Sequence, residues 1–176
     1  MSLSIPAAVD WWRDLQPDPG HNHSGDRAGL ARLRRSATVA EAMQDPATIA
    51  LFRRCGGSGP RDLPAAGLAA AVLAHVREDD RDNPRIARRI GPDTTDKAET
   101  ALLKPLRFRR LMEADGPDDR LASFRRLVGL ARGKLAVGDL TAALLNWSPQ
   151  RQQRWVYDYW NAGQPIATAN TEETAP

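Results

Sequence analysis

Apolar residues recur every three to four positions along most of the chain, which is the spacing of the buried face of an α-helix. One clear series joins Leu121, Phe124, Leu127, Val128 and Ala131. No segment shows a sustained alternation of apolar and polar residues with β-branched side chains, so the pattern predicts no strand. The chain is therefore predicted to be all-α, with no β-sheet.

Helix-start signals indicate where these elements begin. Each combines a side chain that can cap a helix N-terminus with a proline in the first turn or a glutamate three residues later. Examples are Asp45-Pro46, Ser148-Pro149, and Thr38 with Glu41. We expect helices at residues 6–16, 26–36, 39–44, 46–55, 64–78, 84–90, 96–114 with a break around Pro105, 119–132, 136–146 and 149–162.

Loops rich in glycine and proline separate the helices, and one of them, residues 91–95, lies near the middle of the chain. We therefore expect two small helical-bundle lobes, an N-terminal lobe of residues 1–92 and a C-terminal lobe of residues 93–162. Residues 163–176 show no apolar periodicity, and their polar composition predicts a disordered tail.

Composition narrows the class of protein. With 41% hydrophobic and 27% charged residues, the chain has the composition of a water-soluble globular protein rather than that of a disordered or membrane protein. The longest apolar run, Pro64 to Ala74, is shorter than the ~20 residues of a spanning helix. Met1 to Ala8 has no basic segment before an apolar stretch, so we expect a cytoplasmic protein without a membrane partner. A single cysteine, Cys55, cannot form an internal disulfide or a thiolate metal site.

Arginine dominates the charge, because only three of the 25 basic residues are lysine. Residues 104–134 carry nine basic and four acidic side chains, so their local charge of +5 exceeds the +3 of the whole chain. Smaller clusters lie at residues 27–35 and 85–89. Two interpretations stay open: a coding bias towards arginine, or selection of the planar guanidinium for phosphate binding.

Motifs for catalysis and metal binding are weak. His21 and His23 lie in a Pro/Gly-rich loop without a second spaced pair of ligands, so we interpret them as part of a polar loop. The segment 56–60 contains glycines but lacks the Lys-Ser/Thr of a nucleotide-binding loop. Paired acidic residues such as Asp118-Asp119 fall where solvated turns or helix N-termini are expected. We expect no catalytic residue, metal or cofactor.

Basic helix faces remain as candidate chemistry. On a helical wheel, Arg125 and Arg132 lie beside the apolar stripe of their helix, about 10.5 Å apart along its axis. In another basic segment, Arg109 and Arg110 project from the helix face opposite the apolar face that contains Phe108. Such spacing suits neighbouring phosphates of a nucleic-acid backbone. The alternative is a solvated face paired with Asp and Glu, although few carboxylates lie four residues from these arginines.

The aromatic residues are mostly tryptophan. Trp155 and Tyr159 lie one helical turn apart, which favours packing in a core over stacking on unpaired bases. Trp11 and Trp12 are adjacent, so we expect that both cannot face one core. One of them should meet a second lobe, a second subunit or solvent.

The order of several short segments resembles one protein family. These segments are Trp11-Trp12, Gly25-Asp26-Arg27-Ala28, Leu33-Arg34-Arg35, Arg107-Phe108-Arg109-Arg110-Leu111, Phe124-Arg125-Arg126-Leu127-Val128, Asp139-Leu140 with Leu144-x-x-Trp147, Arg151, Arg154-Trp155 and Asp158-Tyr159. Together they resemble the CasB family, the small subunit of the type I-E CRISPR Cascade effector complex. The resemblance runs from about Trp11 to Tyr159 and rests on order and length rather than on one specific motif.

The resemblance implies a non-catalytic subunit that works in antiviral defence. Its partners would be the large subunit, the RNA-bearing backbone subunits, CRISPR RNA-guided target DNA and a second copy packed head to tail. Basic helical faces would lie against the target and displaced DNA strands and stabilise the R-loop. By motif position, the implied nucleic-acid contacts are Arg34, Arg35, Arg107, Arg110, Arg125 and Arg126, and Lys134 follows by proximity alone.

The alternative function is a helical DNA-binding transcriptional regulator. The helix from Asp119 to Arg132 would then enter the major groove and need exposed Asn or Gln side chains to read bases. That helix offers only Ser123 and arginines. Gln150, Gln152 and Gln153 are better base readers, but they share a helix whose aromatic residues predict packing.

Overall fold

The computed structural model describes residues 2–164. This part of the chain forms ten α-helices, one in each place expected from the sequence. They are α1 (Ile5–Leu15), α2 (Arg27–Arg35), α3 (Val39–Met43), α4 (Pro46–Arg54), α5 (Leu63–Leu73), α6 (Ile86–Ile90), α7 (Pro105–Glu113), α8 (Gly116–Leu130), α9 (Val137–Leu145) and α10 (Pro149–Tyr159). Three single-turn 3-10 helices lie at Pro19–His21, Pro60–Asp62 and Ala98–Thr100.

Capping side chains begin several of these helices as the sequence predicts. The Thr38 hydroxyl accepts a hydrogen bond from the Glu41 backbone N–H at 3.1 Å, and the Glu41 carboxylate reaches back to the N–H of Ala37 at 2.7 Å. The side chains of Asp45 and Ser148 each accept one backbone N–H at the start of α4 and α10, from Ala47 and Arg151. These contacts satisfy backbone donors that lack a partner in the first helical turn.

The prediction of no β-sheet is wrong in one place. Strand β1 (Glu78–Asp79) pairs in parallel with strand β2 (Lys134–Leu135). Each strand has two residues, which is too short for an alternating pattern to be visible in the sequence. The pair forms because α5 ends at Leu73, earlier than expected, and the chain that follows it lies beside the chain that leaves α8.

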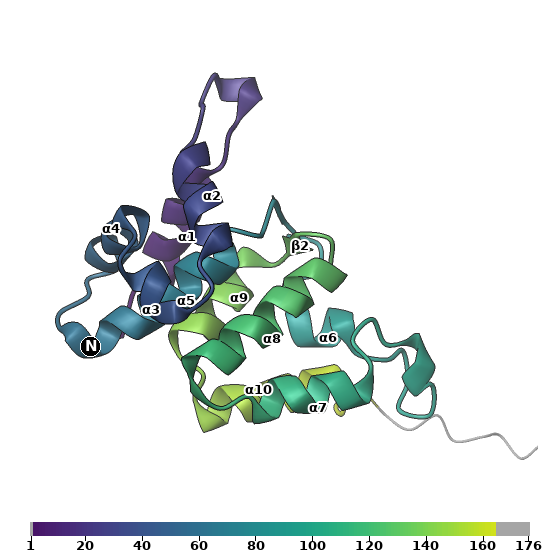
Figure 1. Cartoon of the computed structure of the whole chain (residues 1–176). Helices are drawn as coiled ribbons and strands as arrows, with labels where there is room; N and C mark the ends of the chain where they lie inside the picture. The colour runs from purple at the N-terminus through teal and green to yellow at the C-terminus, as the bar shows by residue number, and fades with distance from the viewer. Residues whose placement is uncertain (1, 165–176) are drawn as a thin grey trace, which may run out of the picture.

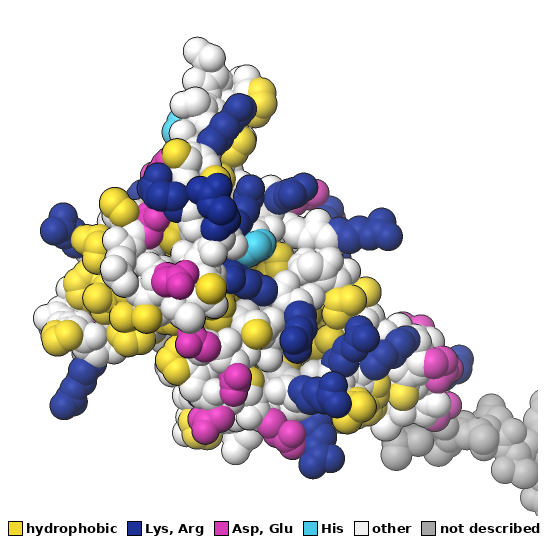
Figure 2. Space-filling model, in the orientation of Figure 1, with side chains coloured by type: hydrophobic (Ala, Val, Ile, Leu, Met, Phe, Trp, Pro, Cys, Tyr) yellow, Lys and Arg dark blue, Asp and Glu magenta, His cyan; other side chains and the backbone are white. Residues whose placement is uncertain are grey.

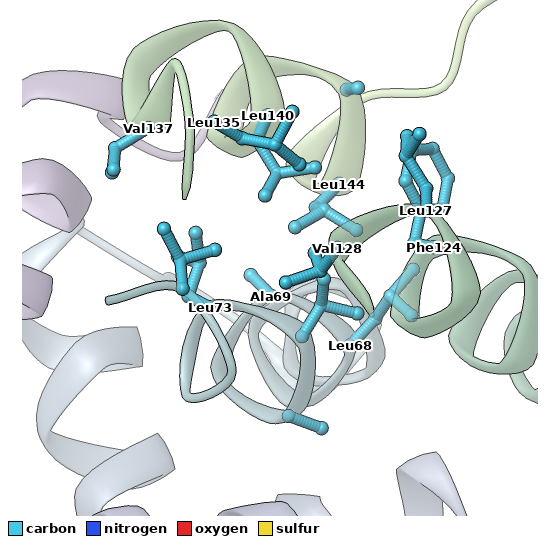
Figure 3. Packing of buried hydrophobic residues seen from close by; sticks show 14 of the residues in the cluster. Leu68, Ala69, Leu73, Phe124, Leu127, Val128, Leu135, Val137, Leu140 and Leu144 are labelled. Atoms are coloured by element: carbon cyan, nitrogen blue, oxygen red, sulfur yellow. The ribbon is translucent and has the colours of Figure 1, made fainter. Parts of the chain in front are cut away.

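Helix α5 is the centre of the fold. It packs against α3 and α4 on one side and against α8 and α9 on the other (Figure 1). Figure 3 shows its Leu68, Ala69 and Leu73 facing apolar side chains of α8 and α9. Every residue from Ala66 to Leu73 is buried, as expected of a helix that is apolar on all sides. Within residues 2–164, no helix combines the length and apolar character that crossing a membrane requires.

Both Trp11 and Trp12 are buried, so the expectation that they cannot share a core is wrong. The Trp11 indole N–H donates to the carbonyl oxygen of Ala47 at 3.0 Å, and that of Trp12 donates to the carbonyl oxygen of Val76 at 3.2 Å. Helix α1 packs against both α4 and α9, and this contact on two sides buries two adjacent side chains.

One cluster of buried residues includes side chains from both halves of the chain. The division into lobes of residues 1–92 and 93–162 stays a prediction. The predicted disordered tail lies outside the described residues, apart from Gly163 and Gln164.

Candidate nucleic-acid interface

Lysine and arginine side chains gather on one face, over α2, α8 and α7 (Figure 2). Three hollows lie along this face. The α7–α8 groove has a volume of about 510 Å³, the central hollow about 350 Å³ and the α2 hollow about 450 Å³. The groove and the central hollow share Gly129, and the central hollow and the α2 hollow share Arg77. No lining residue of the three is Asp or Glu. We call these three hollows the basic band.

Three of the predicted site residues, Arg107, Arg110 and Arg126, line the α7–α8 groove together. Helix α7 buries Phe108 and Leu111, which leaves Arg107 and Arg110 exposed beside the groove. Arg126 is exposed on α8. Within residues 2–164, none of the three arginine side chains has a hydrogen-bond or ion-pair partner. Their guanidinium groups are therefore available to a ligand.

Arg125, the neighbour of Arg126, is used inside the fold. Its guanidinium donates to the carbonyl oxygens of Leu33 at 2.9 Å, Ser36 at 2.7 Å and Ala71 at 3.3 Å. Burial lowers the pKa of Arg125. The acceptors of Leu33 and Ser36 lie at the C-terminal end of α2, where a cation is electrostatically favoured. Arg125 thus joins α2, α5 and α8, and a nucleic-acid contact by this residue stays a prediction.

Arg34, Arg35 and Lys134 have three different environments. Arg34 lines the α2 hollow, but its Nε donates to the carbonyl oxygen of Ala74 at 2.7 Å. Burial, with Arg77 as the second cause, lowers the pKa of Arg34. Arg35 is exposed. Lys134 forms a 2.7 Å ion pair with Glu78, which raises its pKa, and it lines none of the three hollows.

The sequence did not single out two residues that the fold places in the basic band. Arg77 follows the buried helix α5 and lines both the central hollow and the α2 hollow. His75 lines the central hollow, and its Nε2 is buried without a partner in the described chain. Burial, then the charges of Arg125, Arg34 and Arg77, lowers the pKa of His75 to about 4. At neutral pH this imidazole is uncharged, so the charge of the band comes from guanidinium groups.

The chemistry of this face suits binding of a polyanion. Guanidinium groups fit phosphate oxygens, and their regular presence across three hollows would follow a chain of phosphates rather than one small anion. In the part of the chain that the structure describes, no group of three His, Cys, Asp or Glu residues is placed to hold a metal ion.

A family model identifies relatives of this chain. The model for CRISPR-associated protein Cse2 matches residues 29–160. Comparison with curated protein sequences finds no match.

Solved structures resemble the fold over most of its length. CasB from Thermus thermophilus is 26% identical with a TM-score of 0.65, and a second CRISPR-associated protein of the Cse2 family from Thermus thermophilus is 27% identical with a TM-score of 0.63. A chain of E. coli Cascade bound to a PAM-containing dsDNA target is 20% identical with a TM-score of 0.63. Each comparison covers 92% of this chain and 99% of the other.

The resemblance to CasB seen in the sequence is thus confirmed by a family model that spans most of the folded residues and by the structure of CasB itself. The chain belongs to the CRISPR-associated protein Cse2 family.

Proposed function

We propose that this chain is the non-catalytic small subunit of a type I-E Cascade complex and that its basic band holds the sugar-phosphate backbone of target and displaced DNA in the R-loop. The observation that carries the proposal is the set of three arginines without partners in the described chain, Arg107, Arg110 and Arg126, around one groove. Support comes from the family membership and from a similar fold in E. coli Cascade bound to a dsDNA target.

The proposed partners follow from the family. The chain would pack against the RNA-bearing backbone subunits, the large subunit and a second copy of itself, arranged head to tail. Its task would be to stabilise opened DNA, because phosphate contacts add affinity without reading sequence. Arg35 and the lining residues Arg34 and Arg77 would extend the path of phosphates towards α2.

Salt dependence of binding to single-stranded DNA tests this proposal. For single strands, log K falls with log[salt] at a slope near −0.7 per neutralised phosphate. The triple variant Arg107→Ala, Arg110→Ala, Arg126→Ala should therefore flatten the slope by about 2 and weaken binding equally for unrelated sequences. Fluorescence anisotropy over a salt series measures both quantities.

A matched control removes the same charge elsewhere. Arg13, Arg53 and Arg61 are exposed and line none of the three hollows. Their triple alanine variant should keep most of the affinity and the slope. Equal losses in the two triple variants would show that net charge, rather than the groove, binds DNA, and would contradict the proposed site.

The assembled complex separates this function from its alternative. In reconstituted Cascade, the groove variant should shorten the lifetime of the R-loop while the guide RNA stays bound. A sequence-specific footprint from the isolated protein would instead support a DNA-binding regulator. The sequence of α8 argues against that function, since residues 116–130 offer Ser123 and arginines but no Asn or Gln to read bases.

A further inference from the structure

The α7–α8 groove differs from the central hollow in its floor, whereas the α2 hollow also has two apolar lining residues, Pro17 and Leu30. Leu103, Leu111 and Leu130 line it beneath the three arginines, together with the half-buried Ser123. The central hollow has one large apolar lining residue, Val128, among charged and small ones. Figure 2 shows hydrophobic side chains between the basic ones over α7 and α8. One end of the basic band is therefore amphipathic, whereas its centre is polar.

Phosphate binding does not explain an apolar floor. A phosphate group is strongly hydrated, and guanidinium groups alone are sufficient to bind it. A nucleobase has the complementary properties: flat apolar faces, and edges that donate and accept hydrogen bonds. Bases removed from a stack are commonly recognised by contact with apolar or aromatic side chains and with the plane of an arginine.

The groove has the parts that such a base requires. Its volume of about 510 Å³ lies within the range of small-ligand pockets. The planes of Arg107, Arg110 and Arg126 are not held by partners within the described chain, so they are able to lie on a base or to bind its flanking phosphates. The hydroxyl of Ser123 offers one donor and acceptor for a base edge.

We infer that the α7–α8 groove receives an unstacked nucleobase of single-stranded nucleic acid, with the neighbouring phosphates on Arg107, Arg110 and Arg126. The inference rests on the proposed function and adds to it a preference for single strands. In a duplex the bases are stacked and paired, so they cannot enter the groove without a cost in unpairing. The displaced strand of an R-loop has free bases.

Abasic oligonucleotides test the inference directly. A single-stranded DNA oligonucleotide and an oligonucleotide of equal length built of abasic sites carry the same phosphates, so a purely electrostatic surface binds them equally. The full-length protein should bind the oligonucleotide with bases about 10-fold more tightly, which is the scale of one stacked base. Its salt slope should be the same for both.

A groove-filling variant locates the effect. A Cβ atom added at Gly129 meets no heavy atom within 4 Å, so Gly129→Leu projects into open space where the groove meets the central hollow, and the lysine variant below separates the two. This variant should bind both oligonucleotides with the affinity of the abasic one. The matched control is Gly138→Leu, since a Cβ at Gly138 also meets nothing within 4 Å and Gly138 lines none of the hollows. It should keep the 10-fold preference.

A second variant keeps the positive charges of the groove and removes the planar guanidinium groups. Replacing Arg107, Arg110 and Arg126 with lysine should leave binding of the abasic oligonucleotide within about twofold and reduce the preference for bases, because an ammonium group cannot stack. This variant does not depend on the fold tolerating a leucine at residue 129.

The outcomes separate this inference from the proposed function. Equal binding of the two oligonucleotides by the unmodified protein would overturn the inference that the groove receives a base, and it would leave the proposed phosphate binding intact. A preference that survives in both Gly129→Leu and the lysine variant would place base recognition elsewhere and also overturn it. Failure to bind either oligonucleotide at low salt would contradict the proposed function itself.

Discussion

Two arginine clusters of this chain have opposite roles. On α6 and the residue before it, Arg85 forms a 3.1 Å ion pair with Asp158, Arg88 donates to the carbonyl oxygen of Tyr159 at 3.1 Å, and Arg89 forms a 3.2 Å ion pair with Asp80. On α7 and α8, Arg107, Arg110 and Arg126 have no such partners within residues 2–164. Both clusters are dense in arginine, but the first connects α6 to α10 and to Asp80, the residue after β1, and the second faces solvent.

The difference teaches that the acceptors around an arginine, not the density of arginine, decide its role. Asp80 and Asp158 are both buried, and each pairs with an arginine of the α6 cluster. Around the α7–α8 groove the described lining residues include no carboxylate. Arginines near buried acceptors stabilise the fold, whereas arginines over an acid-free groove remain available to bind.

The largest expected effect is a loss of stability when an arginine of the α6 cluster is removed. Asp80 is 1% exposed and Arg89 is 23% exposed, so Arg89→Ala leaves a buried carboxylate without its cation. Loss of one partner of a buried pair typically costs about 3 kcal/mol or more. We expect the free energy of unfolding, measured in urea by circular dichroism, to fall by about this amount.

A nearby surface pair provides the control for Arg89. Arg81 pairs with Asp79 but is 78% exposed, so Arg81→Ala should change stability by less than about 1 kcal/mol. If Arg89→Ala had the same small effect as Arg81→Ala, the α6 cluster would be a solvated surface like the groove, and the contrast between the two clusters would be lost.

The next largest effect is the difference in stability between alanine variants of two adjacent residues, Arg125 and Arg126. Arg125→Ala leaves the carbonyl oxygens of Leu33, Ser36 and Ala71 without their cationic donor, and we expect a loss of about 2 kcal/mol in unfolding free energy. Arg126→Ala should leave stability within about 0.5 kcal/mol and flatten the salt slope of DNA binding by about 0.7.

Unfolding and anisotropy measurements on the two single variants check this contrast. A stable Arg125→Ala protein with weakened DNA binding would move Arg125 from the structural group to the binding group. Thermal melts must accompany the binding data, because a partly unfolded protein also binds less DNA.

The smallest expected effect is on the pH dependence of stability, and it comes from His75 in the central hollow. Its pKa of about 4 in the folded protein lies below the 6.5 of an unfolded histidine. As pH falls from 6.5 to 4, the unfolded chain therefore takes up a proton that the folded chain does not, and stability decreases. Above pH 6.5 both states are uncharged and His75 adds no pH dependence.

A variant without this imidazole isolates its contribution. The unfolding temperature of the unmodified protein should fall more between about pH 7 and about pH 5 than that of His75→Leu, which keeps an apolar side chain at the site. Equal falls in both proteins would show that His75 is able to take up its proton in the folded state, and that the arginines around the hollow do not oppose its charge.

Local signals in the sequence were sufficient to place the ten helices and part of the core. The capping residues Thr38, Asp45 and Ser148 act within a few residues of their own helices, and the apolar face of α8 is visible in the spacing of Phe124 and Leu127. Such interactions depend on residues that are close along the chain, so a single sequence carries them. The family resemblance rests on the order of short segments, which a single sequence also carries, and the family model confirms it.

Only the tertiary structure decided which arginines are free. Arg125 donates to Leu33 and Ser36, about 90 residues earlier in the chain, and Arg85 meets Asp158, 73 residues later. The β1–β2 pair and the burial of both Trp11 and Trp12 likewise depend on helices that meet across the fold. The sequence determined where helices form and that basic faces exist, because periodicity and charge are local properties. Packing determined which of those charges face buried carbonyl and carboxylate groups, because those acceptors approach only when distant segments come together.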